Sequence, residues 1–161
     1  MTDFAPIQIG PVTIAEPVLL APMTGVTDLP FRRMVRRFGS GLVGCTPYEM
    51  AEAAKLSEDR GVAIIDINMG CPVRKVTNGD AGSALMRDLP HAASLIKAVV
   101  GAVSRPVTLK MRMGWDHASL NAPELARIAE DLGVRMVTVH GRTRNQMYKG
   151  SADWRFVARV K

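Results

Sequence analysis

Cysteine is scarce in this chain, and its scarcity limits the kinds of site that the sequence can build. Only two cysteines occur among 161 residues. Cys45 and Cys71 form no C-x-x-C motif and have no metal-ligand spacing. This argues against a disulfide framework and against a zinc site, so we expect two free thiols and no bound metal.

Long apolar runs are lacking as well. No apolar stretch approaches the roughly 20 residues that cross a bilayer, and the first residues lack the basic and apolar regions of a signal peptide. The composition, 47% hydrophobic and 22% charged, is that of a globular rather than a disordered chain. We therefore expect one globular domain in the cytoplasm, with no membrane partner.

Acidic residues are outnumbered, with 15 Asp and Glu against 21 Lys and Arg, which gives a formal net charge of +6. The basic residues gather in three places: Arg32, Arg33, Arg36 and Arg37, then Arg74 and Lys75, then Arg142, Arg144 and Lys149. A polyanionic partner such as a nucleic acid fits this charge. A solvated surface tuned for solubility is the alternative that charge alone leaves open.

Short apolar segments alternate with amphipathic ones along the chain. The apolar segments predict strands at 18–21, 62–67, 107–110 and 136–140, and the amphipathic ones predict helices at 28–38, 46–56, 90–103 and 123–132. Repeated βα units with nearly continuous apolar strands indicate an α/β fold, in which helices cover a parallel sheet.

Polar or sulfur-bearing residues come after the predicted strands each time. They are Met23, Asn68, Cys71, Lys110 and His140. The carboxyl ends of parallel strands meet at one edge of an open sheet or at one mouth of a barrel, and ligands bind there. The sequence therefore predicts a site at this edge.

Three of these residues have a functional and a structural interpretation. Cys71 stands between Gly70 and Pro72, where a thiol can be exposed and reactive, although a lone cysteine is more often a small buried hydrophobe. Lys110 at a strand end suits an anionic or electron-rich ligand, but it can equally extend to solvent. His140, followed by Gly141 and Arg142, suits a phosphate, and a structural histidine is the alternative.

Residues 39–44 match the G-x-G-x-x-G expression of dinucleotide-binding proteins. That motif requires a strand before it, whereas here it comes after a predicted helix. We therefore do not interpret it as a Rossmann site and assign Gly39 to the C-terminus of that helix.

Four ordered segments together resemble one family, the tRNA-dihydrouridine synthases, and in particular its bacterial B-type branch. The first is residues 20–28 with 30–32, and the second is residues 66–72 with the Lys75-Val76 pair and residues 82–85. The third is residues 109–115, and the fourth is residues 139–144. The resemblance implies a TIM (β/α)8 barrel followed by a helical RNA-binding domain. Because 161 residues are too few for both, we expect residues 1–161 to form an incomplete FMN-binding barrel domain, a partial TIM barrel with parallel strands, and the C-terminal helical RNA-binding domain to be absent.

The resemblance also implies an activity, the reduction of a uridine of tRNA to 5,6-dihydrouridine. NADPH would reduce FMN, reduced FMN would pass a hydride to C6 of the uracil, and Cys71 would protonate C5. The cofactor-binding residues carried over by resemblance are Pro22, Met23, Thr24, Lys110 and His140, and the substrate-binding residues are Asn68, Arg112 and Arg142.

The chain also departs from the family. Residues 39–43 resemble the start of the second barrel strand, whereas residues 44–50 resemble the segment after the third strand, so about one βα unit, roughly 30 residues, is missing at Val43-Gly44. The glutamine that the family places against the flavin falls in that unit, and the later strands are missing too. We expect unpaired sheet edges, an exposed apolar face on the strands that end at Asn68, Lys110 and His140, and self-association through them.

Two other functions fit the same residues. One is a different FMN barrel oxidoreductase that acts on a free pyrimidine, although such a substrate needs no basic surface. The other is an inactive truncated remnant without flavin.

Overall fold

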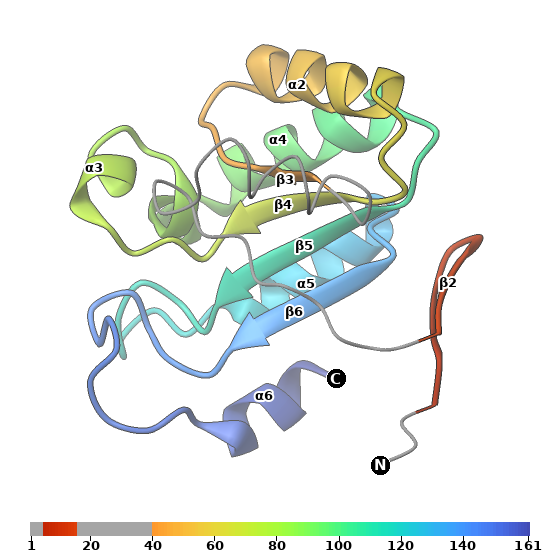
Figure 1. The fold of residues 1–161 in the computed structure, drawn as a ribbon. Coiled ribbons are helices and arrows are strands. Elements are labelled where there is room, and N and C mark those ends of the chain that lie inside the picture. The colour runs from red at the N-terminus through yellow and green to blue at the C-terminus, as the bar shows by residue number, and fades with distance from the viewer. Residues whose placement is uncertain (1–4, 16–39) are drawn as a thin grey trace.

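The computed structural model describes residues 5–15 and 40–161, which form a hairpin and a four-stranded sheet with its helices (Figure 1). Strands β1 (Ile7–Ile9) and β2 (Val12–Ile14) pair antiparallel. The larger sheet consists of β3 (Ser40–Leu42), β4 (Ile65–Met69), β5 (Val107–Arg112) and β6 (Met136–His140). All its neighbouring strands are parallel, in the order β3-β4-β5-β6.

Helices connect these strands, so the described part has the alternation of a βα chain. They are α2 (Pro47–Asp59), α3 (Arg74–Thr77), the 3-10 helix η1 (Gly82–Arg87), α4 (Leu89–Ala102), α5 (Ala122–Asp131) and α6 (Trp154–Val160). The predicted α/β class with parallel strands is confirmed, and the sheet is that of a partial (β/α)8 barrel.

One side of the sheet is apolar and faces the helices. In Figure 1, α4 and α5 lie behind the strands. Side chains on this side, such as Ile65, Ile67, Leu109 and Met111, are at most 1% exposed. They form one core with the apolar faces of α2, α4 and α5. Burial of this layer is the main favourable contribution to the stability of the sheet.

The other side of the sheet is polar. In register, Asp66 pairs with Thr108, Asn68 with Lys110, and Arg112 with His140, and alternation places all six side chains on the face opposite the helices. The prediction of an exposed apolar face was therefore wrong. The apolar residues of β4 and β5 point to the helices of the chain itself, and the residues between them are polar.

The predicted elements agree with the structure within a few residues. The strand at 136–140 is confirmed, and those at 62–67 and 107–110 extend further toward their carboxyl ends, to Met69 and Arg112. As a result Asn68 lies inside a strand rather than after it, and Lys110 lies two residues before the end of β5 rather than at its end. The strand at 18–21 and the helix at 28–38 lie outside the described residues. Within the G-x-G-x-x-G segment, Ser40–Leu42 is itself a strand.

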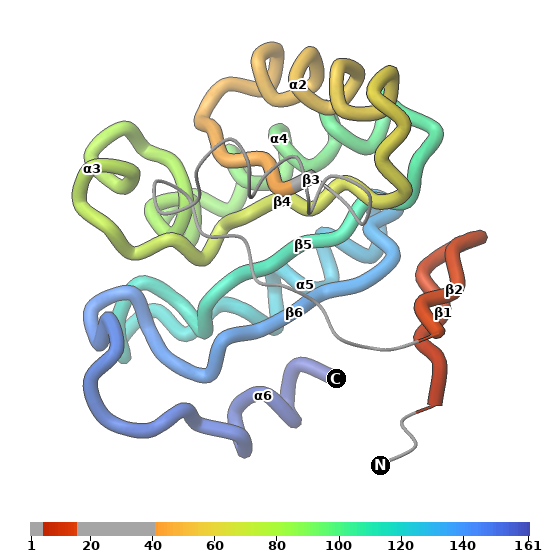
Figure 2. Tube along the Cα trace, in the orientation of Figure 1, coloured from red at the N-terminus to blue at the C-terminus, as the bar shows by residue number. Residues whose placement is uncertain are grey.

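The hairpin lies at the amino ends of the sheet strands, away from the arrowheads in Figure 1, and the same separation can be followed along the tube in Figure 2. Gly10 at its turn has a φ of +55°, and a Cβ there would lie 3.4 Å from Pro106, which directly precedes β5. The sequence pattern did not predict this hairpin, nor α3, η1 and α6. Among the helices of residues 5–15 and 40–161, none has the length and apolar character to cross a membrane.

Candidate active site

Cys71 lies in the loop after β4, and the main chain on both sides of it is held by hydrogen bonds. The Gly70 N–H donates to Asn68 Oδ1 at 2.9 Å, and Arg112 Nε donates to the Gly70 carbonyl at 2.9 Å. The Cys71 carbonyl accepts from Ser83 Oγ at 2.8 Å and from the Ser83 amide at 3.0 Å. The position of the thiol is therefore fixed by β4, β5 and η1 together.

Gly82, at the start of η1, packs directly against this loop. Its φ is +59°, and a Cβ built there would lie 2.8 Å from Cys71 O and 3.1 Å from Cys71 Cβ. Only glycine allows both this backbone conformation and this close approach. The Gly82-Ser83 pair thus holds Cys71 itself, whereas Arg112 holds the preceding Gly70.

Burial does not distinguish the two cysteines, since both thiols are free and half-buried. Their surroundings differ. Cys45 precedes α2, and its carbonyl accepts a hydrogen bond from His91 Nε2 at 2.8 Å. Cys71 lies close enough to Arg112 to raise the pKa of the guanidinium. No group of three or more His, Cys, Asp or Glu side chains in the described ranges could hold a metal ion.

Lys110 projects from the polar side of the sheet next to the Cys71 loop. Its Nζ lies 3.7 Å from the point where a Cβ on Gly70 would stand. Burial lowers the pKa of Lys110, the positive charge of Arg112 lowers it further, and Asp66 opposes both. Lys110 is therefore a partly desolvated cation at the carboxyl edge of the sheet.

Asp66 lies one step before Asn68 on the same side of β4. Its Oδ1 accepts from Thr108 Oγ1 at 2.7 Å, whereas Oδ2 is buried without a hydrogen-bond partner among the described residues. Burial raises the pKa of Asp66 to about 6, against the hydrogen bond from Thr108 and the positive charge of Lys110. Asp66 was not among the residues predicted for the site, although the i, i+2 spacing to Asn68 places both on one side of a strand.

His140 ends β6, and its ring faces a set of positive charges. Burial lowers its pKa to about 4, helped by the charges of Arg112, Lys110 and Arg142. Arg142 Nη1 lies 3.2 Å from His140 Nε2, and Nη2 donates to the Gly150 carbonyl at 2.7 Å. Because a guanidinium can only donate, Nε2 accepts and the imidazole proton is on Nδ1.

Arg112 is 2% exposed and lies between two loops. Besides the bond from Nε to Gly70 O, its Nη1 donates to the carbonyls of Thr143 at 2.9 Å and Met147 at 2.8 Å in the loop after β6. Its guanidinium also lies 5.7 Å from the ring centroid of Tyr148. Its Nη2 makes no hydrogen bond to a described residue.

An aromatic side chain joins the loops further out. The guanidinium groups of Arg87 and Arg144 lie over the ring of Trp115, 4.3 and 4.5 Å from its centroid. Arg144 Nη2 also donates to Thr77 Oγ1 at 3.5 Å. These contacts connect η1 and α3, which come after Cys71, to the loops after β5 and β6.

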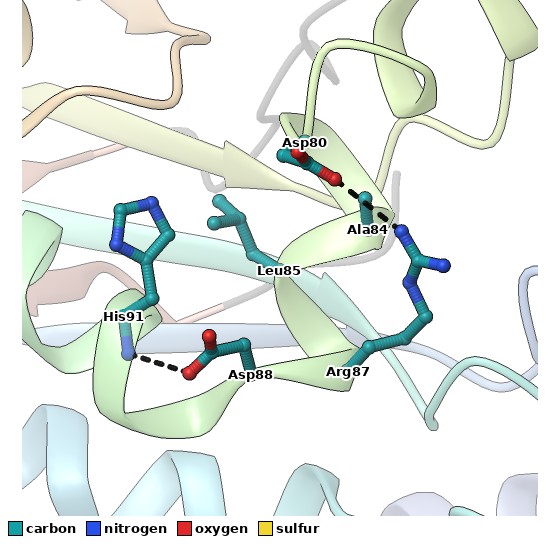
Figure 3. Close-up of a pocket in the computed structure, with 6 residues that line it drawn as sticks. All are labelled: Asp80, Ala84, Leu85, Arg87, Asp88 and His91. Atoms are coloured by element: carbon teal, nitrogen blue, oxygen red, sulfur yellow. Dashed lines mark hydrogen bonds and ion pairs between the residues drawn. The ribbon is translucent and has the colours of Figure 1, made fainter.

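A cavity of about 390 Å³ lies beside η1 and the start of α4 (Figure 3). It is lined by Asp80, Ala84, Leu85, Arg87, Asp88 and His91. Its polar groups already bind one another, since Arg87 pairs with Asp80 at 3.4 Å and Asp88 caps α4 by accepting from the His91 amide. It contains none of the predicted site residues, and we assign it no ligand.

The structure thus brings six predicted site residues to the carboxyl edge of the sheet: Asn68, Cys71, Lys110, Arg112, His140 and Arg142. Pro22, Met23 and Thr24 lie outside the described residues. A thiol near clustered cations at the carboxyl ends of parallel strands lies where α/β-barrel proteins bind their ligands.

Comparison with known proteins gives the particular family. The family model described as dihydrouridine synthase matches residues 41–161, and this chain belongs to that family. It is 50% identical over 191 residues to a protein of Rhodobacter capsulatus and 49% identical over 191 residues to one of Rickettsia bellii, both named "Probable tRNA-dihydrouridine synthase". It is 45% identical over 189 residues to tRNA-dihydrouridine synthase B of Xanthomonas campestris.

These alignments also show how the chain differs from its relatives. Each of the three covers 96% of this chain, but only 57–59% of the length of the relative. An alignment of 191 positions exceeds the 161 residues available, so it contains positions at which this chain has no residue. Such gaps agree with the missing βα unit inferred at Val43-Gly44. In the structure, β3 on one side of this junction pairs directly with β4.

Proposed function

We propose that this chain is part of an enzyme that reduces a uridine of tRNA to 5,6-dihydrouridine, with Cys71 as the proton donor. The observation that carries the proposal is the fixed Cys71 loop beside Lys110 and Arg112 at the carboxyl edge of the sheet. Membership of the dihydrouridine synthase family and the names of the relatives support it.

We propose FMN as the cofactor, which the described residues fit, and NADPH as the reductant, which the resemblance to the family implies. The positive charges of Lys110, Arg112 and Arg142 converge on His140, and such a cluster suits the phosphate of FMN and the negative charge of a reduced flavin ring. Lys110 and His140 would hold the ring and the phosphate end, and Pro22, Met23 and Thr24 would contact the ring. When bound, FMN would supply the hydride that C6 of the uracil receives.

The residues of the chain itself account for the remaining steps. Hydride at C6 leaves negative charge on C5 and on the uracil carbonyl oxygen, and the nearby cations stabilise that charge. The Cys71 thiol gives its proton to C5, which completes the reduction, and solvent then reprotonates the thiolate. Binding at Cys71 requires that the uridine leave its base stack.

Three side chains are proposed to bind the uracil: Asn68, Arg112 and Arg142. Asn68 Oδ1 is occupied by the Gly70 N–H, so its Nδ2 is the group left to donate to a carbonyl oxygen. The Nη2 group of Arg112 is likewise left to donate to the uracil, because it makes no hydrogen bond to a described residue. Around them, the exposed side chains of Arg74, Lys75 and Lys149 would meet the tRNA backbone.

Matched cysteine variants test this function. The purified chain is incubated with FMN, NADPH and an unmodified tRNA transcript, and dihydrouridine is measured as the gain of two hydrogen atoms by nucleoside mass spectrometry. We expect Cys71→Ala to abolish product while flavin reduction by NADPH continues, and Cys45→Ala to retain turnover, because only one thiol serves as the acid. Equal loss in the two variants would exclude Cys71 as the specific donor.

The alignment gaps, which agree with a missing βα unit at Val43-Gly44, favour a second candidate, a member of the family without flavin. The visible absorbance of the purified protein separates the two: flavin bands that remain after gel filtration support the enzyme, and their absence even after addition of FMN supports the inactive form.

A further inference from the structure

Arg112 makes more contacts with the protein main chain than a substrate contact requires. Its Nε and Nη1 donate to carbonyls in two separate loops, that of Gly70 before Cys71 and those of Thr143 and Met147 after His140. A guanidinium presents its donors in a rigid fork, so these three bonds fix the distance between the loops as well as each loop.

One of the residues held by Arg112 is strained. Met147 has a φ of +54°, a left-handed conformation that is unfavourable for a residue with a Cβ, and it persists where the surroundings enforce it. The Met147 carbonyl accepts from Arg112 Nη1, and its amide donates to Arg144 O at 3.0 Å. Arg112 therefore helps to enforce this turn.

The charge of Arg112 is part of the arrangement. Burial is the main cause that lowers its pKa, the nearby charges of Arg142 and Arg144 lower it further, and Tyr148 and Cys71 raise it. Lys110 adds a further positive charge from the same strand. Retention of a 2% exposed cation among like charges is costly unless its donors are used, and here the Nε and Nη1 donors are used on the main chain.

We propose that Arg112 is a positioning residue that links the loop carrying Cys71 to the loop carrying Arg142. It would thereby fix the position of the Cys71 thiol relative to the His140 and Arg142 side chains. The inference rests on the proposed function only in naming Cys71 as the reacting thiol. The linkage itself needs neither flavin nor tRNA.

Thiol protection in the full chain measures this linkage. In a Cys45→Ala background Cys71 is the only thiol, and its alkylation by iodoacetamide reports how often the loop opens. We expect Arg112→Lys, which keeps the charge and loses the fork, to speed alkylation at least about tenfold, which corresponds to an opening that is easier by about 1.4 kcal/mol. The rate should depend weakly on urea, as for a local opening.

A reciprocal background gives the control. With Cys71→Ala, Cys45 is the only thiol, and Arg112→Lys should leave its alkylation rate unchanged. A change in stability alone would instead speed both thiols, with a strong urea dependence for each. Adding Met147→Gly to Arg112→Lys should restore part of the Cys71 protection, since glycine adopts the turn without being held.

The outcomes distinguish this inference from the proposed function. Unchanged Cys71 protection in Arg112→Lys, or an equal increase at Cys45, would overturn the positioning role. If circular dichroism shows that the Arg112→Lys variant is unfolded, the single variant Met147→Gly decides. The inference requires that Cys71 in this variant be alkylated at the same rate or more slowly, and a faster rate overturns it. Absence of dihydrouridine in all variants would reject the proposed function while leaving the linkage intact.

Discussion

The packing of η1 against the Cys71 loop gives a quantitative prediction at Gly82. A methyl group there would lie 2.8 Å from Cys71 O and 2.9 Å from Val76 Cγ1, on a residue whose φ is +59°. The left-handed conformation costs about 1–2 kcal/mol for a residue with a Cβ. Overpacking costs about 1–3 kcal/mol more. We therefore expect Gly82→Ala to lower the free energy of unfolding by about 2–5 kcal/mol.

Two other glycines provide matched controls. Gly61 has a φ of +77° but nothing within 4 Å of its Cβ position, so Gly61→Ala should cost only the conformational part, about 1–2 kcal/mol. Gly101, in the last turn of α4, has open space and no left-handed backbone, and Gly101→Ala should stabilise by about 0.5–1 kcal/mol. Urea unfolding of the three variants measures all these values. Equal costs at Gly82 and Gly61 would refute the close contact with Cys71.

Three further predictions concern charged side chains. The pKa of Asp66 is raised to about 6, so the folded state holds its proton more tightly than the unfolded state, and stability should fall as pH rises from about 4 through 6. That loss is of the order of 3 kcal/mol. In Asp66→Asn the urea unfolding midpoint should depend less on pH, and an unchanged slope of midpoint against pH would contradict the burial of this carboxyl. His140, with its pKa lowered to about 4, should stay neutral near pH 6 when its ring protons are followed by NMR, and a midpoint at the ordinary 6.5 would disprove the cationic surroundings. Lys110→Ala should weaken FMN binding in equilibrium dialysis, and undiminished occupancy would remove Lys110 from the site.

The sequence predicted those parts of the fold that depend on local pattern. The strand at 136–140 and helices α4 and α5 result from apolar periodicity. Each helix buries an apolar face, and Val137 and Val139 of the strand pack, partly buried, against the core. The hairpin, α3, η1 and α6 were not predicted, since they are short and depend on turns, caps and contacts with distant residues. Asp153, for example, caps α6 through the Phe156 amide at 2.9 Å.

The candidate site divides in the same way. The convergence of Asn68, Lys110 and His140 could be predicted, because the carboxyl ends of parallel strands meet at one edge. The bonds from Arg112 to the main chain could not, because they join residues 31 to 42 positions apart and depend on where two loops pass. The error about an apolar face arose from treating each strand as uniformly apolar, although Asp66 and Thr108 alternate with Ile65, Ile67 and Leu109.

The two-sided sheet also determines which segments can be added to it. β3 and β6 are the outer strands of the described sheet, and each has a neighbour on one side only. The apolar side chains of the sheet are already covered by the helices of the chain itself. A strand added next to β3 or β6 therefore needs only to form main-chain hydrogen bonds and to continue the polar side of the sheet. The fold is modular in that sense. Each βα repeat covers the apolar side of its own strand with a helix, and repeats can be joined or separated at the hydrogen-bonded edges of the strands.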